Sequence, residues 1–128
     1  MEKFVITKNT NDEFQFNFID KKGNIILTSS GYTRKFMCVK GIESVKSNSQ
    51  DDTKFFRKTA SNNTVYFNLK AFNGKIIGIS KMFEDRPSRD IGIQFLKDKA
   101  PDAIIEDHSK LSAKKIYSTS RNIAILEI

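Results

Sequence analysis

Residues 65–80 read VYFNLKAFNGKIIGIS, and their pattern predicts a β-hairpin. Val65, Phe67 and Leu69 are apolar and alternate with more polar residues, which is the period of a strand with one buried face. An Asn-Gly pair then favours a tight turn, and the apolar run after it predicts the returning strand. This hairpin is the unit from which the fold of the whole chain can be worked out.

The length of the hairpin loop decides which side chains share a face. A three-residue loop over residues 72–74 pairs Leu69 with Ile77 and Phe67 with Ile79, so that all four side chains are buried. A two-residue loop would turn the isoleucines to the other face, because a shift of one residue exchanges the faces of a strand. We therefore predict the longer loop, with its last residue, a glycine, in the left-handed conformation beside a bulge.

The same pattern occurs earlier, at residues 14–29, which read FQFNFIDKKGNIILTS. There the loop is expected at residues 21–23, with Phe18 facing Ile26. Identical residues recur at a constant separation of 51 positions without a gap, among them Phe4/Phe55, Phe16/Phe67, Asn17/Asn68, Gly23/Gly74, Ile26/Ile77, Ser29/Ser80 and Gly41/Gly92. This regularity indicates a tandem duplication.

Each repeat is expected to hold three strands followed by a helix. The strands are predicted at residues 3–8, 14–19, 24–29 and 54–58 and within 65–80, and a last short strand at 103–107. Thr33 is the expected cap of a first helix that runs to about residue 47. Asp85-Arg86-Pro87 opens the second, with the proline in its first turn.

One face of each predicted helix should meet the sheet, because its residues are spaced three and four apart. These residues are Cys38, Gly41, Ile42 and Val45 on the first helix and Arg89, Gly92, Ile93 and Leu96 on the second. A glycine inside a helix costs about 1 kcal/mol relative to alanine. We expect Gly41 to allow a close approach of its helix to the sheet.

The chain is interpreted as repeat 1 (1–50), repeat 2 (51–107) and a basic C-terminal extension (108–128). A unit of this size buries little apolar surface by itself, so the two repeats should pack as one domain. The extension has no counterpart in the repeats. Its end, residues 123–128, reads IAILEI and is expected to form a strand that docks on a sheet edge of this chain or of a partner.

The chain has 128 residues, with 22 Lys and Arg against 15 Asp and Glu, and a net charge of +7. Its basic residues occur in nearly every segment, which fits either a soluble basic protein or affinity for nucleic acid. One cysteine permits no intrachain disulfide, and we find neither a signal pattern nor an apolar run of about 20 residues. We expect a cytoplasmic protein without a cofactor.

Several motifs resemble the YegP-like family, small bacterial proteins with a domain of unknown function. They are YFNLKAFNG at residues 66–74, GIESV at 41–45, KTASN at 58–62 and SRDIGI at 88–93. The resemblance covers about residues 3–107 and includes the tandem arrangement. The first repeat departs from it, with DKKG at residues 20–23 where the family has K-A-x-N-G, and nothing carries over to the tail.

The resemblance implies an α+β fold of two β-β-β-α(-β) repeats. These share an antiparallel sheet, have their helices on one face and are related by a pseudo-two-fold axis. It also implies that the C-terminal strands are exchanged between the repeats, with residues 103–107 as the exchange strand of repeat 2. The family brings no established activity, cofactor or catalytic residue.

We expect no catalytic site and no metal site. Cys38 lies on a predicted buried face, where cysteine acts as a small hydrophobe. His108, the only histidine, stands beside Glu106 and Asp107 without the ligand spacing of a zinc site. No phosphate-binding, dinucleotide-binding, zinc-protease or nucleophile-elbow motif occurs.

Arg89 is the first candidate binding residue, because it stands where the first repeat has Cys38, on a face that should meet the sheet. A buried arginine needs a partner. One interpretation is structural: an ion pair, with Glu84 or Asp85 as the expected partner, or a hydrogen bond to a backbone carbonyl at the rim of the core. The other is a guanidinium that binds an anion at the seam between the repeats.

The remaining candidates are Asn17, Asn68, Tyr66 and Lys70, which stand on the wetter strand faces. They are either solvated positions or a surface that binds a peptide or a base. Our main hypothesis is a non-enzymatic interaction module with a macromolecular partner, as a monomer rather than a dimer. The alternative is a nucleic-acid-binding protein that uses the basic tail and the face of Tyr66, Asn68 and Lys70, since an aromatic with basic neighbours can stack and attract single strands.

Overall fold

The computed structural model describes residues 1–110, 116–119 and 123–126. Its strands are β1 (Lys3–Lys8), β2 (Phe14–Ile19), β3 (Ile25–Thr28), β4 (Phe55–Thr59), β5 (Val65–Lys70), β6 (Ile76–Ser80), β7 (Ile104–Asp107), β8 (Ile116–Thr119) and β9 (Ile123–Leu126). Its helices are α1 (Lys35–Asn48) and α2 (Arg86–Lys99), and a short 3-10 turn, η1 (Asp52–Lys54), precedes β4. The predicted α+β class and the order of the elements in both repeats are confirmed.

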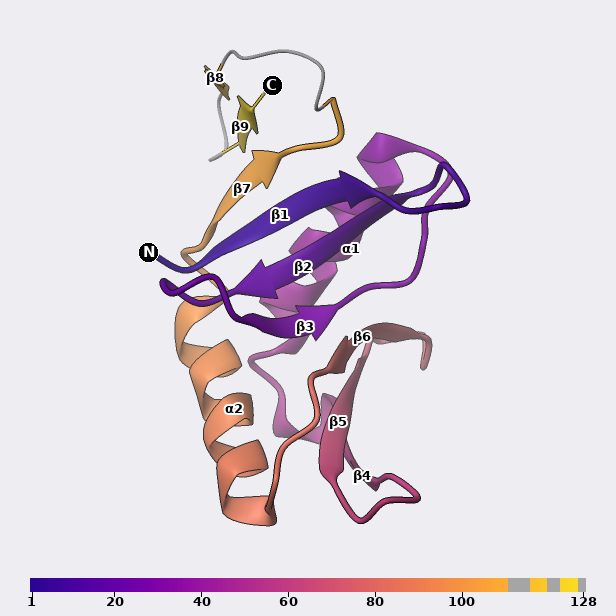
Figure 1. The fold of residues 1–128 in the computed structure, drawn as a ribbon, viewed down its shortest axis with the longest axis vertical. Helices are drawn as coiled ribbons and strands as arrows, with labels where there is room; N and C mark the ends of the chain where they lie inside the picture. Colours follow the sequence, from indigo (N-terminus) through magenta and orange to yellow (C-terminus); the bar gives the residue numbers. More distant parts are fainter. Residues whose placement is uncertain (111–115, 120–122, 127–128) are drawn as a thin grey trace.

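All nine strands form one sheet in the order β4-β5-β6-β3-β2-β1-β7-β9-β8. Two three-stranded units meet at β3 and β6, which pair antiparallel through Leu27 with Ser80 and Thr28 with Ile79 (Figure 1). The strands within each unit are antiparallel, as expected, whereas β7 runs parallel to both β1 and β9. The sheet is therefore mixed at one end.

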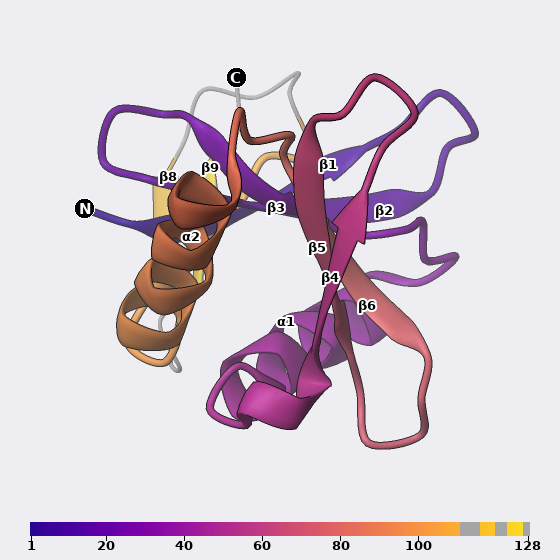
Figure 2. The ribbon, with the colours of Figure 1, turned by 90° about the horizontal axis from the view of Figure 1, so that it is seen from below.

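Both helices lie on the same side of the sheet (Figure 2). The Tyr32 ring, before α1, stacks on Phe16 of β2 at 6.4 Å, and the Phe83 ring, before α2, stacks on Phe67 of β5 at 6.3 Å. The predicted helix faces are buried in full. We call the face that carries the helices the inner face, and the opposite one the outer face.

Gly41 allows a close approach, as expected, but the tightest contact is with the ring of Tyr32 before the helix and not with the sheet, where Phe16 Cε2 would lie 3.2 Å from a Cβ atom at Gly41. A Cβ atom at Gly41 would lie 2.4 Å from Tyr32 Oη, and one at Gly92 would lie 2.5 Å from Phe83 Cζ. Real Cβ contacts of that length do not occur, so the aromatic ring before each helix fits only against a glycine. The two repeats use the same device at equivalent positions.

The predicted three-residue hairpin loops are confirmed, but the pairing beyond them is not. Ala71 N–H donates to Lys75 O across the second loop, and Gly74 has a φ of +83°. One step further a bulge inserts Ile77, so that Leu69 pairs with Gly78 instead of Ile77.

The bulge recurs in the first repeat, where Phe18 pairs with Leu27 instead of Ile26. An extra residue on one strand reverses the faces of all residues after it. Ile77 is buried as predicted, but Ile79 pairs with Asn68, not Phe67, and is 45% exposed on the outer face.

The two helices begin differently. The cap of α1 is Arg34 instead of the predicted Thr33, and it makes no side-chain capping hydrogen bond. The helix α2 opens at the predicted residues, and Asp85 caps it, since its carboxylate accepts a hydrogen bond from Ser88 N–H at 2.9 Å. Pro87 lies in the first turn of α2, where its missing N–H costs no helical bond.

The expected exchange strand is present. After α2 the chain does not return to its own repeat, and β7 pairs with β1, from Lys3 with Ile104 to Ile6 with Asp107. The predicted docking of the last apolar stretch is confirmed for residues 123–126, because β9 pairs with β7 of the same chain. Residues 127–128 lie outside the described residues. In the part of the chain that the structure describes, no helix is long and apolar enough to cross a membrane.

Candidate binding surface

A single row of side chains crosses the outer face from one edge strand to β7. The strand register places its members side by side: Phe56, Asn68, Ile79, Thr28, Asn17, Val5 and Glu106. The row contains two of the predicted site residues, Asn17 and Asn68, at symmetry-related positions. Tyr66 and Lys70 stand on the same face, two residues before and after Asn68 on β5.

The two asparagines differ in their hydrogen bonds. Asn17 Oδ1 accepts from Thr28 Oγ1 at 2.8 Å. Asn68 is only 7% exposed, and its Oδ1 has no hydrogen-bond partner among the described residues. The cause lies in the sequence, because Ile79 occupies the place in repeat 2 that Thr28 has in repeat 1. A buried acceptor without a partner is unfavourable, so Asn68 is not explained by the packing of the fold alone.

Tyr66 and Lys70 both lie beside residues of β4. Lys58 stands directly opposite Tyr66, and Lys70 Nζ lies 4.0 Å from the centroid of the Phe56 ring. Lys58 and Phe56 are exposed, and Tyr66 and Lys70 are half-buried. The outer face of β4 and β5 therefore carries two rings and two ammonium groups in one cluster, which we call the aromatic-basic cluster.

The charge of the molecule is concentrated on the same half of the sheet. Residues 53–83, which contain β4, β5 and β6, include six Lys and Arg and no Asp or Glu. The equivalent residues of repeat 1, 2–32, include four basic and four acidic residues. Charges of one sign on a shared surface attract a polyanion more strongly than the same charges spread evenly.

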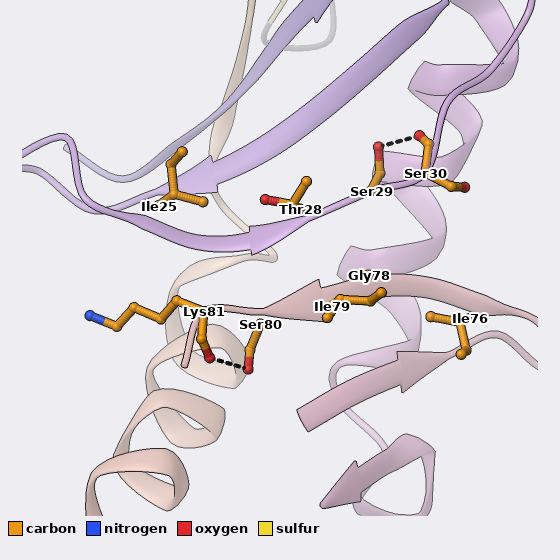
Figure 3. Close-up of a pocket in the computed structure, with 9 residues that line it drawn as sticks. All are labelled: Ile25, Thr28, Ser29, Ser30, Ile76, Gly78, Ile79, Ser80 and Lys81. Carbon is orange, nitrogen blue, oxygen red and sulfur yellow. Dashed lines mark hydrogen bonds between the residues drawn. The ribbon is translucent and has the colours of Figure 1, made fainter. Parts of the chain in front are cut away.

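A pocket of about 490 Å³ opens on the outer face where β3 and β6 diverge. Figure 3 shows its lining residues, with Ile25 and Thr28 on β3, Ser29 directly after it, and Gly78, Ile79 and Ser80 on β6. The hydroxyls of Ser29 and Ser80 are both engaged in hydrogen bonds with the backbone, and the lining is otherwise mostly apolar. With the exposed Lys81 on its rim, the pocket suits an apolar group beside an anion.

Arg89 lies on the inner face, away from the other candidates. It is 6% exposed, and its Nε lies 3.4 Å from Asp90 Oδ1, which also accepts a hydrogen bond from Arg57 Nε at 3.0 Å. The hydrogen bond from Arg57 is the main cause that lowers the pKa of Asp90. The expected partners of Arg89 were Glu84 or Asp85, and this was wrong, because the carboxylate of Asp85 is used to cap α2.

Cys38 and His108 carry groups that could react, but one is buried and the other lies against a carboxylate. Cys38 is fully buried, and burial together with nearby Asp107 raises the pKa of its thiol to about 12. The ring Nε2 of His108 lies 3.0 Å from Glu106 Oε1, and the other oxygen of this carboxylate, Oε2, accepts a hydrogen bond from Lys3 Nζ. Within residues that the structure describes, no group of three His, Cys, Asp or Glu side chains is placed to hold a metal ion.

The sequence placed Asn17, Asn68, Tyr66 and Lys70 on the strand face opposite the helices, and Arg89 on the helix face that meets the sheet, and the structure agrees. It did not single out Phe56 and Lys58. The signal for them was available, since residues 53–83 lack acidic residues. The basic tail that the nucleic-acid hypothesis also used cannot be added to this surface, because Lys114, Lys115 and Arg121 lie outside the described residues.

Comparison with known proteins places these features in a family. The model of a domain of unknown function, DUF1508, matches residues 9–55 and again residues 60–107. The UPF0339 protein YegP of Escherichia coli (strain K12) is 41% identical over 106 residues, which cover 83% of this chain and 96% of that protein.

Two solved structures resemble the fold. The solution NMR structure of a UPF0339 protein from Shewanella oneidensis has a TM-score of 0.79 and 37% identity and covers 84% of this chain and 92% of its own. The solution NMR structure of YegP from E. coli has a TM-score of 0.79 and 40% identity, with 84% and 93% covered. Both are similar to this chain over the two repeats.

Proposed function

This chain belongs to the DUF1508 family, whose domain has no known function, and from that premise we propose that it is a non-enzymatic binding module for an anionic macromolecule. The observation that carries the proposal is the acid-free half of the sheet, residues 53–83, with its six basic residues. The aromatic-basic cluster lies on this half and supplies exposed apolar area beside the charges. Binding surfaces commonly combine aromatic anchors with basic side chains.

The chemistry of the described residues supports binding over catalysis. A nucleophile needs an accessible side chain beside a base. Cys38 is buried, and its raised pKa keeps the thiol protonated near neutral pH. The pocket between β3 and β6 contains Lys81 as its one ionisable lining residue, and lysine alone provides no acid-base pair.

A protein segment with acidic residues is the first partner that we propose. Six basic residues, of which Arg57 alone forms an ion pair among the described residues, attract such a segment over a distance of about 10 Å at 0.1 M salt. The pocket beside Ile79 then offers a place for one of its apolar side chains. The module acts as a monomer in the cytoplasm, where a lone free cysteine such as Cys38 stays reduced.

Single-stranded nucleic acid is the second partner, and the aromatic-basic cluster favours it. Tyr66 and Phe56 present rings on the outer face, and Lys58 and Lys70 stand beside them. Bases stack on aromatic side chains, and phosphates pair with nearby lysines, without a need for sequence recognition.

A fluorescence titration at two salt concentrations tests the proposal. The probes are single-stranded and double-stranded oligonucleotides and poly-glutamate. We expect saturable binding that weakens steeply as the salt concentration rises. The double variant Lys58→Glu/Lys70→Glu should bind the probes much more weakly than the unchanged chain. Lys21→Glu/Lys22→Glu is the matched control, because it changes the charge equally on the loop of the other repeat.

The outcome also separates the partners. Binding of single strands that is lost in Tyr66→Ala favours nucleic acid, whereas binding of poly-glutamate alone favours a protein partner. If neither polyanion binds at low salt, the proposal is wrong, and the charge of the β4–β6 half serves solubility only.

A further inference from the structure

The edge of β1 shows how this fold holds an added strand. There β7, with the sequence IIED, pairs in parallel with β1. Its two acids are fixed by two lysines: Lys3 Nζ lies 2.9 Å from Glu106 Oε2, and Lys35 Nζ lies 2.5 Å from Asp107 Oδ2. Main-chain pairing and two ion pairs together hold this strand.

The edge of β4 is the pseudo-symmetric equivalent of the edge of β1. Lys54 stands at the position of Lys3, and Arg86 at the position of Lys35, the first residue of each helix. Repeat 2 therefore has a basic residue at both positions, although neither Lys54 nor Arg86 makes an ion pair with any residue that the structure describes. Lys54 Nζ instead lies 5.3 Å from the centroid of the exposed Phe72 ring.

No strand lies beyond β4 in the described part of the chain, because β4 is the first strand in the sheet order. The chain itself explains why. After α1 it passes through η1 directly into β4, so the segment that follows the first helix becomes the first strand of repeat 2. The segment after the second helix, β7, is already paired with β1. Four of the five residues of β4 are consequently exposed.

We propose that the open edge of β4 binds an extended segment of another protein in which two apolar residues precede two acidic ones. The segment runs parallel to β4, as β7 runs parallel to β1, and adds a strand to the sheet. Its first acid pairs with Lys54 on the outer face, and its second pairs with Arg86 at the start of α2. Arg57 lies close to this second position, because its Nε contacts Asp90 in the first turns of α2.

The charges of β4 also decide against a second copy of this chain as the occupant. Arg57 and Lys58 are exposed on the edge strand, and lysine and arginine at an edge oppose pairing between two like copies. The same charges favour an acidic strand. This inference rests on the proposed function, because it identifies one partner of the binding module and the edge at which that partner lies.

The chain provides its own probe for the test. A labelled peptide with the sequence of residues 102–109, DAIIEDHS, reproduces the strand that β1 already accepts. We expect the fluorescence anisotropy of the peptide to show saturable binding to the full chain. In NMR spectra of the full chain, the amide signals of β4 should shift when the peptide is added. A peptide with Gln and Asn in place of the two acids should bind at least about tenfold more weakly.

Variants locate the peptide and separate this inference from the proposed function. The double variant Lys54→Glu/Arg86→Glu should lower the affinity for the peptide about tenfold or more. The control Lys21→Glu/Lys22→Glu should leave this affinity unchanged. Thermal melting of each variant checks that the fold is kept. The double variant Lys58→Glu/Lys70→Glu should weaken the binding of polyanions to the outer face more than it weakens the binding of the peptide.

Three results would overturn the inference. The first is no peptide binding while polyanions still bind, which leaves the proposed function standing. The second is peptide binding that shifts the amides of β1 rather than β4, since the peptide would then replace β7. The third is that Lys54→Glu/Arg86→Glu weakens the binding of an oligonucleotide but leaves the affinity for the peptide unchanged. If neither peptide nor polyanion binds, the inference and the proposed function fail together.

Discussion

Asp107, the last residue of β7, accepts an ion-paired hydrogen bond of 2.5 Å from Lys35, the first residue of α1. Its side chain is only 2% exposed and also accepts hydrogen bonds from the backbone and hydroxyl of Ser109. The contact joins an element of each repeat. It therefore fastens the exchanged strand to the half of the molecule that receives it.

Replacing the carboxylate should weaken the whole domain. Asp107→Asn keeps the shape of the side chain but removes the charge that pairs with Lys35. We expect a loss of about 2 kcal/mol in the free energy of unfolding, measured by urea denaturation. Asp12→Asn is the control, since the pair of Asp12 with Lys8 is exposed and should contribute under about 1 kcal/mol. Equal effects of the two changes would contradict the fastening role.

Stability should fall in acid. Burial alone would raise the pKa of Asp107, but hydrogen bonds from Lys35 and Ser109 outweigh it and lower that pKa below its ordinary value. A carboxylate with a lowered pKa stabilises the fold above its unfolded pKa of about 3.9, and this contribution is lost as the pH falls through the folded pKa. The urea midpoint should therefore drop between pH 6 and pH 3.

The same acid titration of Asp107→Asn provides the comparison. Because this variant lacks the titrating group, its midpoint should drop less than that of the unchanged chain over the same pH range. An unchanged pH dependence would assign the acid sensitivity to other carboxylates, such as Glu106, whose pKa is also lowered.

The unpartnered acceptor of Asn68 should be repairable. Ile79→Thr places a hydroxyl where Thr28 stands relative to Asn17, and should restore the missing hydrogen bond. Ile79 is 45% exposed, so the loss of apolar burial is small. We expect the free energy of unfolding to rise by about 1 kcal/mol.

Thr28→Val tests the reverse change in repeat 1 and should lower the free energy of unfolding by about 1 kcal/mol. Should Ile79→Thr destabilise the chain, the side chain of Ile79 must matter more for packing than the hydrogen bond does. A stabilised variant that loses partner binding would instead show that Asn68 keeps its free oxygen for a ligand.

Cys38 should resist thiol reagents in the folded chain. With a pKa of about 12, its thiol is almost entirely protonated at pH 8, and the side chain is fully buried. Since only the thiolate reacts quickly, we expect the rate of modification to follow unfolding and to rise sharply through the urea transition. Rapid modification of the folded chain at pH 8 would contradict this and would revive Cys38 as a functional group.

Period-two alternation, helical spacing and the separation of 51 positions predicted the strands and helices of both repeats and the two hairpin loops, but not β8, which has no counterpart in the repeats. They could not predict the register beyond the loops, because counting from Gly74 assumes that no residue is inserted. The bulge at Ile77 breaks that assumption, and nothing in the local sequence distinguishes Ile77 from its neighbour Ile76.

The sequence could predict on which face of the sheet the candidate residues lie, but not which side chains they contact. Strand alternation places Asn68 and Lys70 on the outer face whatever the register of the neighbouring strands. The partner of Arg89 depends on which carboxylate is free, and Asp85 was already committed to the helix cap. The correspondence of Lys54 with Lys3 is visible in the sequence, but its meaning needs the observed pair of Lys3 with Glu106.

The exchanged strand also governs the order in which the chain can fold. Lys3 pairs with Ile104, so β1 meets its second neighbour, β7, only after nearly all of both repeats has been synthesised. During translation the N-terminal repeat therefore waits with one edge of β1 unpaired, and contacts of such long sequence separation slow folding. The two repeats cannot be cut apart into independent halves, because the first borrows its last strand from the second.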